Sequence, residues 1–110
     1  MVVVRNKRTY KGPGEYIGRP SILGNPYSVV KGNPEFTREK VIGYYRNWLK
    51  GRLAGRHEAT LAELRRLVDW ATNNDLNLIC WCAPLACHGD VLKECIESLI
   101  SKGTWEGFGL

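Results

Sequence analysis

The stretch from Asn77 to Ile100 (NLICWCAPLACHGDVLKECIESLI) constrains the fold more than any other part of the chain. Its first five residues, Asn77 to Trp81, form a short apolar run that is typical of a buried strand and too short for an independent helix. From Asp90 onward the apolar residues recur on one side of a helix: Val91, Leu92, Cys95, Ile96, Leu99 and Ile100. The sequence therefore predicts a strand, a loop from Cys82 to Gly89 and a helix in immediate succession.

This succession also predicts where a ligand binds. In open α/β sheets, ligands collect outside the carboxyl ends of the strands. The first turn of a helix presents free N–H groups and the positive end of the helix dipole, which favour an anion. The cysteines and the histidine of the loop are thus expected beside a binding pocket.

The length and composition predict one ordinary globular domain spanning residues 1–110. A chain of 110 residues is long enough for a single hydrophobic core, and its 44% hydrophobic and 25% charged residues are typical of globular proteins. No apolar run reaches the length of a membrane span, and Arg5 follows the first apolar residues too soon for a signal peptide. We therefore expect a cytoplasmic location, no membrane partner and reduced cysteines.

The net charge of +5 predicts an anionic partner. A small phosphorylated or carboxylated molecule and a nucleic acid are both compatible with it. Lys and Arg are spread along the chain without a long basic block, which is also the pattern of a plain solvated surface. The charge alone does not choose between these partners, and the sequence identifies no cofactor and no oligomeric state.

Two further helices and two further strands complete the predicted fold. Thr37 is the expected N-cap of a helix whose apolar residues extend to Leu53. A second helix is expected to begin at Thr60, with Glu63 in capping-box spacing, and to end near Asn74. Short extended segments are predicted at Val2–Val4 and near Tyr16. The expected class is α/β, a small Rossmann-like three-layer domain with about three helices and a mostly parallel sheet covered on both faces.

The loop supplies three candidate catalytic residues, Cys82, Cys87 and His88. A Cys that follows a strand, with a helix beginning soon after, is similar to the strand, C-x5-R loop and helix of phosphatase and rhodanese-like thiol enzymes. Here His88 stands where those enzymes have an Arg, so Arg19 is the first candidate to replace it. A helix N-terminus and an imidazolium both lower a thiol pKa, so Cys82 or Cys87 is a candidate nucleophile or redox thiol.

Other interpretations of the same residues stay open. The spacing C-x-C-x4-C-H of Cys80, Cys82, Cys87 and His88 contains metal ligands but has no matching second pair, so no metal site is assigned. Cys82 and Cys87 could also be small packing residues. Asp90 is both a good helix N-cap and a candidate to bind the hydroxyls of a ligand together with Gly89.

A second group of candidate residues lies in GRPSILGNP, from Gly18 to Pro26. Arg19 can bind a phosphate or carboxylate through two parallel hydrogen bonds, and Ser21 and Asn25 supply a hydroxyl and an amide. The segment matches neither a P-loop nor a G-x-G-x-x-G fingerprint, which argues against standard ATP or NAD binding.

The segments GRPSILGNPY, TREKVIGYYRNWL and LICWCAPLACHGDVLKE together resemble the domain of unknown function 4326 family of bacteria and phages. The matching residues are Arg19, Ser21, Gly24, Asn25, Pro26, Tyr45, Cys80, Trp81, Cys82, Pro84, Cys87, His88, Gly89 and Asp90. A looser likeness is to domain of unknown function 488, in which a strand also ends in a Cys. The resemblance implies that the two groups of candidate residues face one another in a single pocket.

We therefore expect a domain that binds a phosphate-bearing or nucleotide-like small molecule at the carboxyl ends of its strands. Arg19, Ser21 and Asn25 would lie on one side of the ligand, with Cys82, Cys87, His88, Gly89 and Asp90 on the other. Whether the domain is an enzyme is left open. The alternatives are a basic nucleic-acid-binding module and a metal-binding structural domain.

Overall fold

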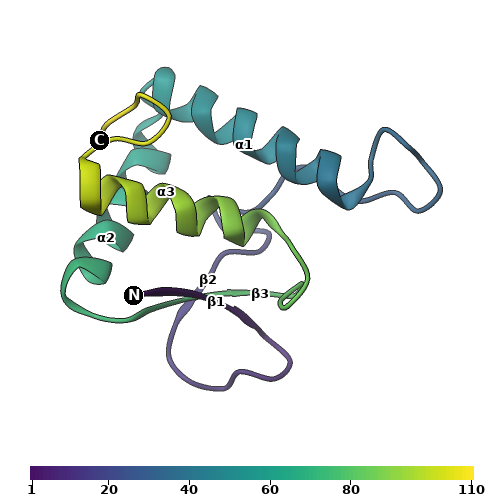
Figure 1. The fold of residues 1–110 in the computed structure, drawn as a ribbon, viewed down its shortest axis with the longest axis horizontal. Coiled ribbons are helices and arrows are strands. Elements are labelled where there is room, and N and C mark those ends of the chain that lie inside the picture. Colours follow the sequence, from purple (N-terminus) through teal and green to yellow (C-terminus); the bar gives the residue numbers. More distant parts are fainter.

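The computed structural model describes residues 1–110 as three helices packed on a small parallel sheet (Figure 1). The strands are β1 (Val2–Asn6), β2 (Glu15–Tyr16) and β3 (Leu76–Cys80), and their order in the sheet is β1-β3-β2. Both outer strands run parallel to β3, with Val2 opposite Leu76 and Glu15 opposite Leu78. The predicted α/β class, the parallel sheet and the three helices are confirmed.

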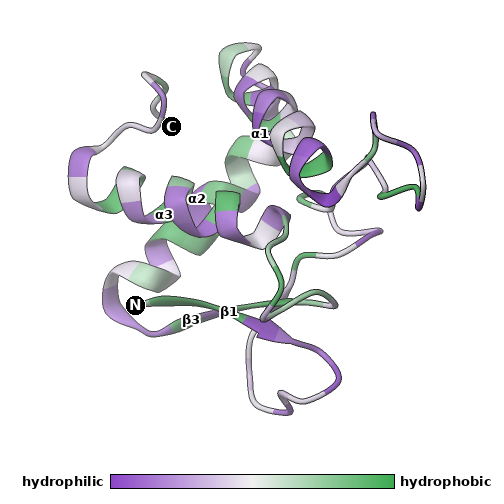
Figure 2. Ribbon diagram, turned by 45° about the vertical axis from the view of Figure 1, so that its right-hand side comes forward, coloured by the Kyte–Doolittle hydropathy of each residue, from purple (hydrophilic) through white to green (hydrophobic).

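The helices are α1 (Arg38–Ala54), α2 (Glu58–Asn73) and α3 (His88–Lys102). In both ribbon views they lie on the same side of the sheet (Figures 1 and 2), and their buried apolar residues belong to one core shared with the sheet. Leu76, Leu78 and Cys80 of β3 are buried on that side, so the strand alternates between buried and half-buried positions. None of the helices combines the length and the apolar character needed to span a membrane.

The opposite face of the sheet is covered by a loop, where the sequence had suggested a third layer of helix. Asn77 and Ile79 on this face are only half-buried. The loop of residues 7–14 passes over them, and a Cβ atom on Gly14 would come within 2.8 Å of the Ile79 side chain. A two-residue β2 and a five-residue β3 present so little apolar surface on this face that a loop is enough to cover it.

The helix caps were predicted with mixed success. Thr37 caps α1 as expected, and its hydroxyl accepts a hydrogen bond from the backbone N–H of Lys40 at 3.2 Å. The predictions of Thr60 and Asp90 as N-caps were wrong. His57 caps α2, and Cys87 caps α3 with Asp90 three residues further on, in a capping box.

One continuous core joins the sheet to all three helices. Its twenty buried residues include Tyr45 and Leu49 of α1, Leu64 of α2, and Leu92 of α3. The hydroxyl of Tyr45 is buried and donates a 2.7 Å hydrogen bond to the carbonyl oxygen of Leu23. This bond attaches the irregular segment after β2 to α1 and therefore helps to position it.

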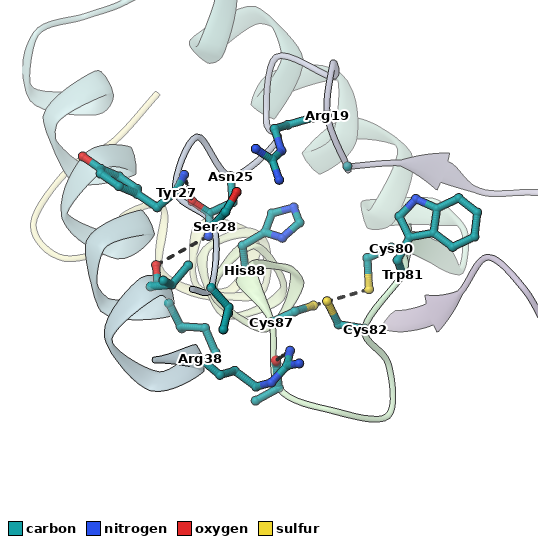
Figure 3. Close-up of a pocket in the computed structure, with 15 residues that line it drawn as sticks. Arg19, Asn25, Tyr27, Ser28, Arg38, Cys80, Trp81, Cys82, Cys87 and His88 are labelled. Atoms are coloured by element: carbon teal, nitrogen blue, oxygen red, sulfur yellow. Dashed lines mark hydrogen bonds between the residues drawn. The ribbon is translucent and has the colours of Figure 1, made fainter. Parts of the chain in front are cut away.

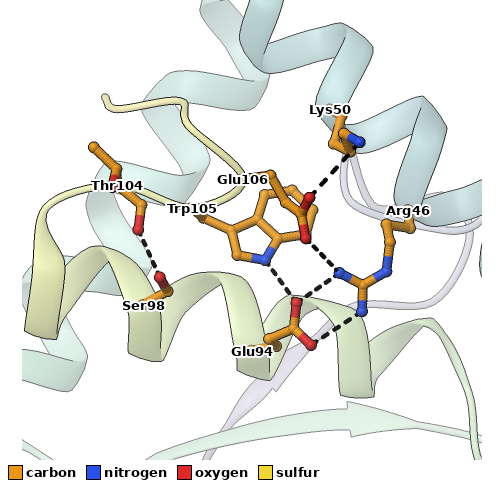
Figure 4. Close-up of polar contacts among 7 residues, drawn as sticks. All are labelled: Arg46, Lys50, Glu94, Ser98, Thr104, Trp105 and Glu106. Atoms are coloured by element: carbon orange, nitrogen blue, oxygen red, sulfur yellow. Dashed lines mark hydrogen bonds and ion pairs between the residues drawn. The ribbon is translucent and has the colours of Figure 1, made fainter.

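The carboxyl-terminal tail packs back on the helices (Figure 4). Trp105 is buried, and its indole Nε1–H donates a 2.8 Å hydrogen bond to Glu94 Oε2 of α3. Arg46 of α1 binds the same carboxylate through two hydrogen bonds of 2.6 and 3.0 Å. These contacts hold the pKa of Glu94 down to about 2, since the Arg46 guanidinium and the Trp105 indole both stabilise the carboxylate.

Candidate functional site

A cavity of about 350 Å³ lies at the carboxyl end of β3 (Figure 3). Its walls are formed by the segment after β2, the first turns of α1, the residues that follow β3, and the start of α3. Backbone hydrogen bonds bring these segments together, because Ile17 N–H donates to the Ile79 carbonyl oxygen at 3.0 Å. Residues 18 and 19 therefore line the same pocket as Cys80 and Trp81.

Five of the eight predicted site residues line this pocket: Arg19, Asn25, Cys82, Cys87 and His88. The other three lie outside its lining. Ser21 uses its hydroxyl within its own turn, accepting a 3.3 Å hydrogen bond from Leu23 N–H. Gly89 is buried between α3 and the sheet, and the carboxylate of Asp90 accepts a 3.0 Å hydrogen bond from Cys87 N–H.

The N-terminus of α3 is largely occupied by its own cap. Asp90 holds the N–H of Cys87, and the sulfur of Cys87 accepts a 3.3 Å contact from the N–H of Gly89. The negative charge of Asp90 also lies in the first helical turn. An anion in the pocket would therefore depend more on arginine side chains than on this helix terminus.

Two guanidinium groups lie on opposite sides of the pocket (Figure 3). Arg38, in the first turn of α1, donates one hydrogen bond of 3.0 Å to the Ala86 carbonyl oxygen. Arg19 makes no hydrogen bond or ion pair with any other side chain, and its guanidinium points toward His88. Arg19 thus has its full set of N–H donors free for a ligand.

The remaining walls combine aromatic, amide and hydroxyl groups. Tyr27 and Trp81 also line the pocket, with 38% and 51% of their surface exposed, and their rings point away from its centre (Figure 3). Asn25 accepts a 2.9 Å hydrogen bond from Tyr27 N–H, which stabilises the turn that carries Tyr27 and Ser28. Trp81 is fixed in turn by its indole N–H, which donates to Tyr16 Oη at 3.0 Å.

Two cysteine sulfurs meet at the base of this pocket. Cys80 ends β3 and Cys87 caps α3, and their Sγ atoms lie 3.4 Å apart. The Cys87 thiol, together with the backbone N–H groups of Cys82 and Ala83, stabilises the Cys80 thiolate and lowers the pKa of Cys80 to about 6. The pKa of Cys87 is raised, since the pair shares a proton and the site is buried.

His88 is held as a neutral imidazole. Burial lowers its pKa, and the nearby charge of Arg19 lowers it further, although the Ile17 carbonyl opposes this effect. Its Nε2 atom lies 2.8 Å from that carbonyl oxygen, so the Nε2–H tautomer donates there. The ring also packs edge-on against Tyr45, with centroids 5.0 Å apart. His88 therefore positions the segment after β2 in addition to lining the pocket.

The other two cysteines differ in their surroundings. Cys82 is half-buried and lines the pocket, two residues beyond the end of the strand. Cys95 lies in the core, as predicted, and burial raises its pKa to about 12. No group of three or more His, Cys, Asp or Glu side chains is arranged to hold a metal ion.

Ten of the fifteen lining residues were absent from the predicted site, among them Tyr27, Ser28, Arg38 and Cys80. Arg38 carried a usable signal, because it immediately follows a recognised helix cap and so lies at a helix N-terminus. The signal for Cys80 was its place at the end of a strand. Nothing local distinguished Tyr27 and Ser28 from other turn residues, since their role depends on where the whole segment is placed.

The sequence was compared with family models, with curated proteins and with solved structures. A family described as Domain of unknown function (DUF4326) matches residues 2–98, which include every residue that lines the pocket. The chain belongs to the DUF4326 family. The comparisons with curated proteins and with solved structures gave no match.

The pocket therefore lies entirely within the part of the chain that the family model matches. The match begins in β1 and ends within α3, so it covers all three strands and the two earlier helices. The tail with Trp105 and Phe108 lies beyond it. The looser likeness to domain of unknown function 488 stays a prediction.

Proposed function

We propose that this DUF4326 protein binds a small phosphate-bearing molecule of nucleotide type in the pocket at the end of β3. The observation that carries the proposal is the free guanidinium of Arg19, directed into a cavity that Arg38 lines from the opposite side. A guanidinium recognises phosphate through paired, charge-assisted hydrogen bonds. The net charge of +5 would favour the approach of such an anion.

The apolar walls suit the base of a nucleotide. Val29, Val41 and Ile42 supply apolar surface, and Trp81 and Tyr27 lie at the edges of the pocket with their rings directed outward (Figure 3). Small-molecule sites typically have volumes of roughly 300–1,000 Å³ and place a few polar groups on mostly apolar walls. The cavity of about 350 Å³ lies at the small end of this range, so we propose a ligand no larger than a mononucleotide.

Thiol chemistry on the bound ligand belongs to the same proposal. Cys82 and Cys87 line the pocket with His88, and the lowered pKa of Cys80 beside them favours a thiolate there. His88 is neutral and could accept a proton through Nδ1, because Nε2 donates to Ile17. The cysteines are all free, which suits the reducing cytoplasm that we propose as the location.

The test is calorimetric titration of the protein with nucleoside 5′-monophosphates and with inorganic phosphate. Arg19→Gln should weaken the binding of any such anion at least about tenfold, the equivalent of losing about 1.4 kcal/mol. The matched control is Arg52→Gln, which removes the same charge from the last turn of α1, where Arg52 stacks on Trp48. Equal affinity of the two variants, or no binding by the wild-type protein, would contradict the proposal.

A nucleic acid is the second candidate partner, because cations and aromatic rings are interleaved on the surface next to the pocket. This basic-aromatic surface consists of Arg5, Lys7, Arg8, Tyr10, Lys11, Tyr16 and Trp81. Arg5 lies over the Tyr10 ring at 5.0 Å and Lys7 over the Tyr16 ring at 5.4 Å. Such surfaces bind single strands through phosphate contacts and base stacking.

Fluorescence anisotropy with a labelled oligothymidylate tests this second candidate. If the surface binds strands, affinity should fall steeply with salt because cations are released from the nucleic acid. The triple variant Lys7→Gln, Arg8→Gln, Lys11→Gln should then reduce the salt dependence. The control variant, with Arg52, Lys93 and Lys102 changed to Gln on the helices, removes the same charge and should not.

A further inference from the structure

We infer that Cys80 and Cys87 are a redox pair that closes to an intramolecular disulfide at the base of the pocket, with a peroxide as oxidant and a small thiol as reductant. This inference is independent of the ligand proposed above, since it concerns only the two sulfurs and their surroundings.

The arrangement of the two residues supports the closure. Cys80 is the last residue of β3 and Cys87 is the cap residue directly before α3, so each is held by a regular element. Their sulfurs already lie 3.4 Å apart, against about 2.05 Å in a disulfide. The six residues between them form no helix or strand, so this loop can take up the small shift that bonding requires.

Access to the pair is limited to the pocket. Cys80 and Cys87 are 1% and 4% exposed, yet both line the cavity. A molecule as small as hydrogen peroxide can therefore reach the sulfurs through the pocket, whereas a large protein oxidant cannot. The half-buried Cys82 lines the same pocket but makes no hydrogen bond with either sulfur, and Cys95 does not line the pocket, so Cys80 and Cys87 are the two sulfurs already in contact.

The surroundings also favour a reactive thiolate at Cys80. The sulfur of Cys87 lies within hydrogen-bond distance at 3.4 Å, and this contact together with the backbone N–H groups of Cys82 and Ala83 lowers the pKa of Cys80, so negative charge on this sulfur is stabilised. The thiolate is the form of cysteine that attacks peroxides and disulfides. Cys87 is then the resolving thiol, already in place beside the attacked sulfur.

The chemistry balances without a metal or cofactor. The Cys80 thiolate attacks one oxygen of hydrogen peroxide, the O–O bond breaks, and the hydroxide that leaves takes up a proton to become water. The sulfur of Cys87 then attacks the Cys80 sulfenic acid, the S–S bond forms, and the second oxygen leaves as water with the Cys87 proton. The two thiols lose two electrons and two protons in total, and hydrogen peroxide is reduced to two water molecules. A small thiol reverses the reaction by exchange and is itself oxidised to its disulfide.

The experiment uses the full chain with Cys82→Ser and Cys95→Ser, so that only the proposed pair remains. After treatment with hydrogen peroxide and alkylation of free thiols, its intact mass should fall by two hydrogens with no alkyl group added, and dithiothreitol should reverse this. Peptide mapping of oxidised wild-type protein should show the Cys80 to Cys87 link. This second measurement needs no variant, so it holds even if a substitution disturbs folding.

Three results would overturn the inference. The first is a double variant that stays fully alkylated after peroxide treatment. The second is a wild-type link that joins Cys82 to either partner in place of the Cys80 to Cys87 link. The third is irreversible oxidation to sulfinic acid with no disulfide formed. A failure of nucleotide binding would leave all three readouts unaffected, so the two proposals can fail separately.

Discussion

The Nε2 atom of His88 lies 2.8 Å from the carbonyl oxygen of Ile17, a residue 71 positions earlier in the chain. This hydrogen bond joins the first turn of α3 to the segment that carries Arg19. It therefore connects the two groups of residues that form the candidate site. Because the imidazole is buried, the bond also ties the stability of the site to pH.

The pH dependence of folding follows from the lowered pKa of His88. The folded protein holds this imidazole neutral, because burial and the charge of Arg19 oppose its protonation, whereas Asp90 acts in the other direction. The unfolded chain binds the proton with a pKa of about 6.5. Below that pH the unfolded state binds more protons than the folded state, so the free energy of unfolding should decrease as the pH falls through this range.

Urea denaturation at several pH values measures this effect. His88→Gln keeps a donor for Ile17 but does not titrate, so the decrease in stability just below pH about 6.5 should become smaller. In the control His57→Asn the decrease should persist, because Asn is a good cap for α2 and His88 is unchanged. A variant at His88 with the same pH profile as wild type would refute this assignment.

Gly89 is predicted to be a packing residue of α3. A Cβ atom at this position would lie 3.0 Å from both Ile17 Cδ1 and Val4 Cγ1 and 3.2 Å from Cys87 Sγ. Gly89→Ala should therefore force the helix away from the sheet and lower the free energy of unfolding by about 1–3 kcal/mol. Thermal or urea denaturation provides the measurement.

Gly43 on α1 is the matched control for this substitution. It is exposed, and a Cβ atom there meets nothing within 4 Å. Gly43→Ala should stabilise the protein by about 0.5–1 kcal/mol, because alanine loses less backbone freedom in a helix. Changes of the same sign at both positions would show that close packing does not determine the effect at Gly89.

The hydroxyl of Tyr45 should matter more than that of its neighbour Tyr44. Both donate a 2.7 Å hydrogen bond to a backbone carbonyl, Tyr45 to buried Leu23 and Tyr44 to exposed Glu35. Tyr45→Phe leaves a buried acceptor without a partner and should lower the free energy of unfolding by about 1–3 kcal/mol. Water replaces the lost donor in Tyr44→Phe, which should change stability by less than about 0.5 kcal/mol.

These two tyrosine variants are compared by urea denaturation under the same conditions. Tyr45→Phe should also loosen the segment that carries Arg19, because Leu23 lies in that segment. Hydrogen exchange of the amides between residues 18 and 29 measures this local effect. Equal losses of stability in the two variants would mean that burial of the acceptor is not the cause.

The elements of the fold followed from local patterns in the sequence. Three of them depend on interactions between near neighbours: the inward positions of α3 from Val91 to Leu99, the Thr37 cap, and the strand that ends among the cysteines. Periodicity and capping residues therefore predict them. Ile100 was also expected to face inward and is 41% exposed, because it lies about 100° around the helix from Leu99, at the edge of the buried stripe.

The tertiary structure decided which residues line the pocket. Each residue turns a helix by about 100°, so starting α3 at His88, with Cys87 as its cap, directs Gly89 into the sheet and Asp90 back to the cap. The sequence placed Cys82, Cys87 and Arg19 near a strand end. Only the packed chain sets the sulfur of Cys80 against that of Cys87 and Arg38 opposite Arg19, because these contacts depend on side-chain directions across segments far apart in sequence.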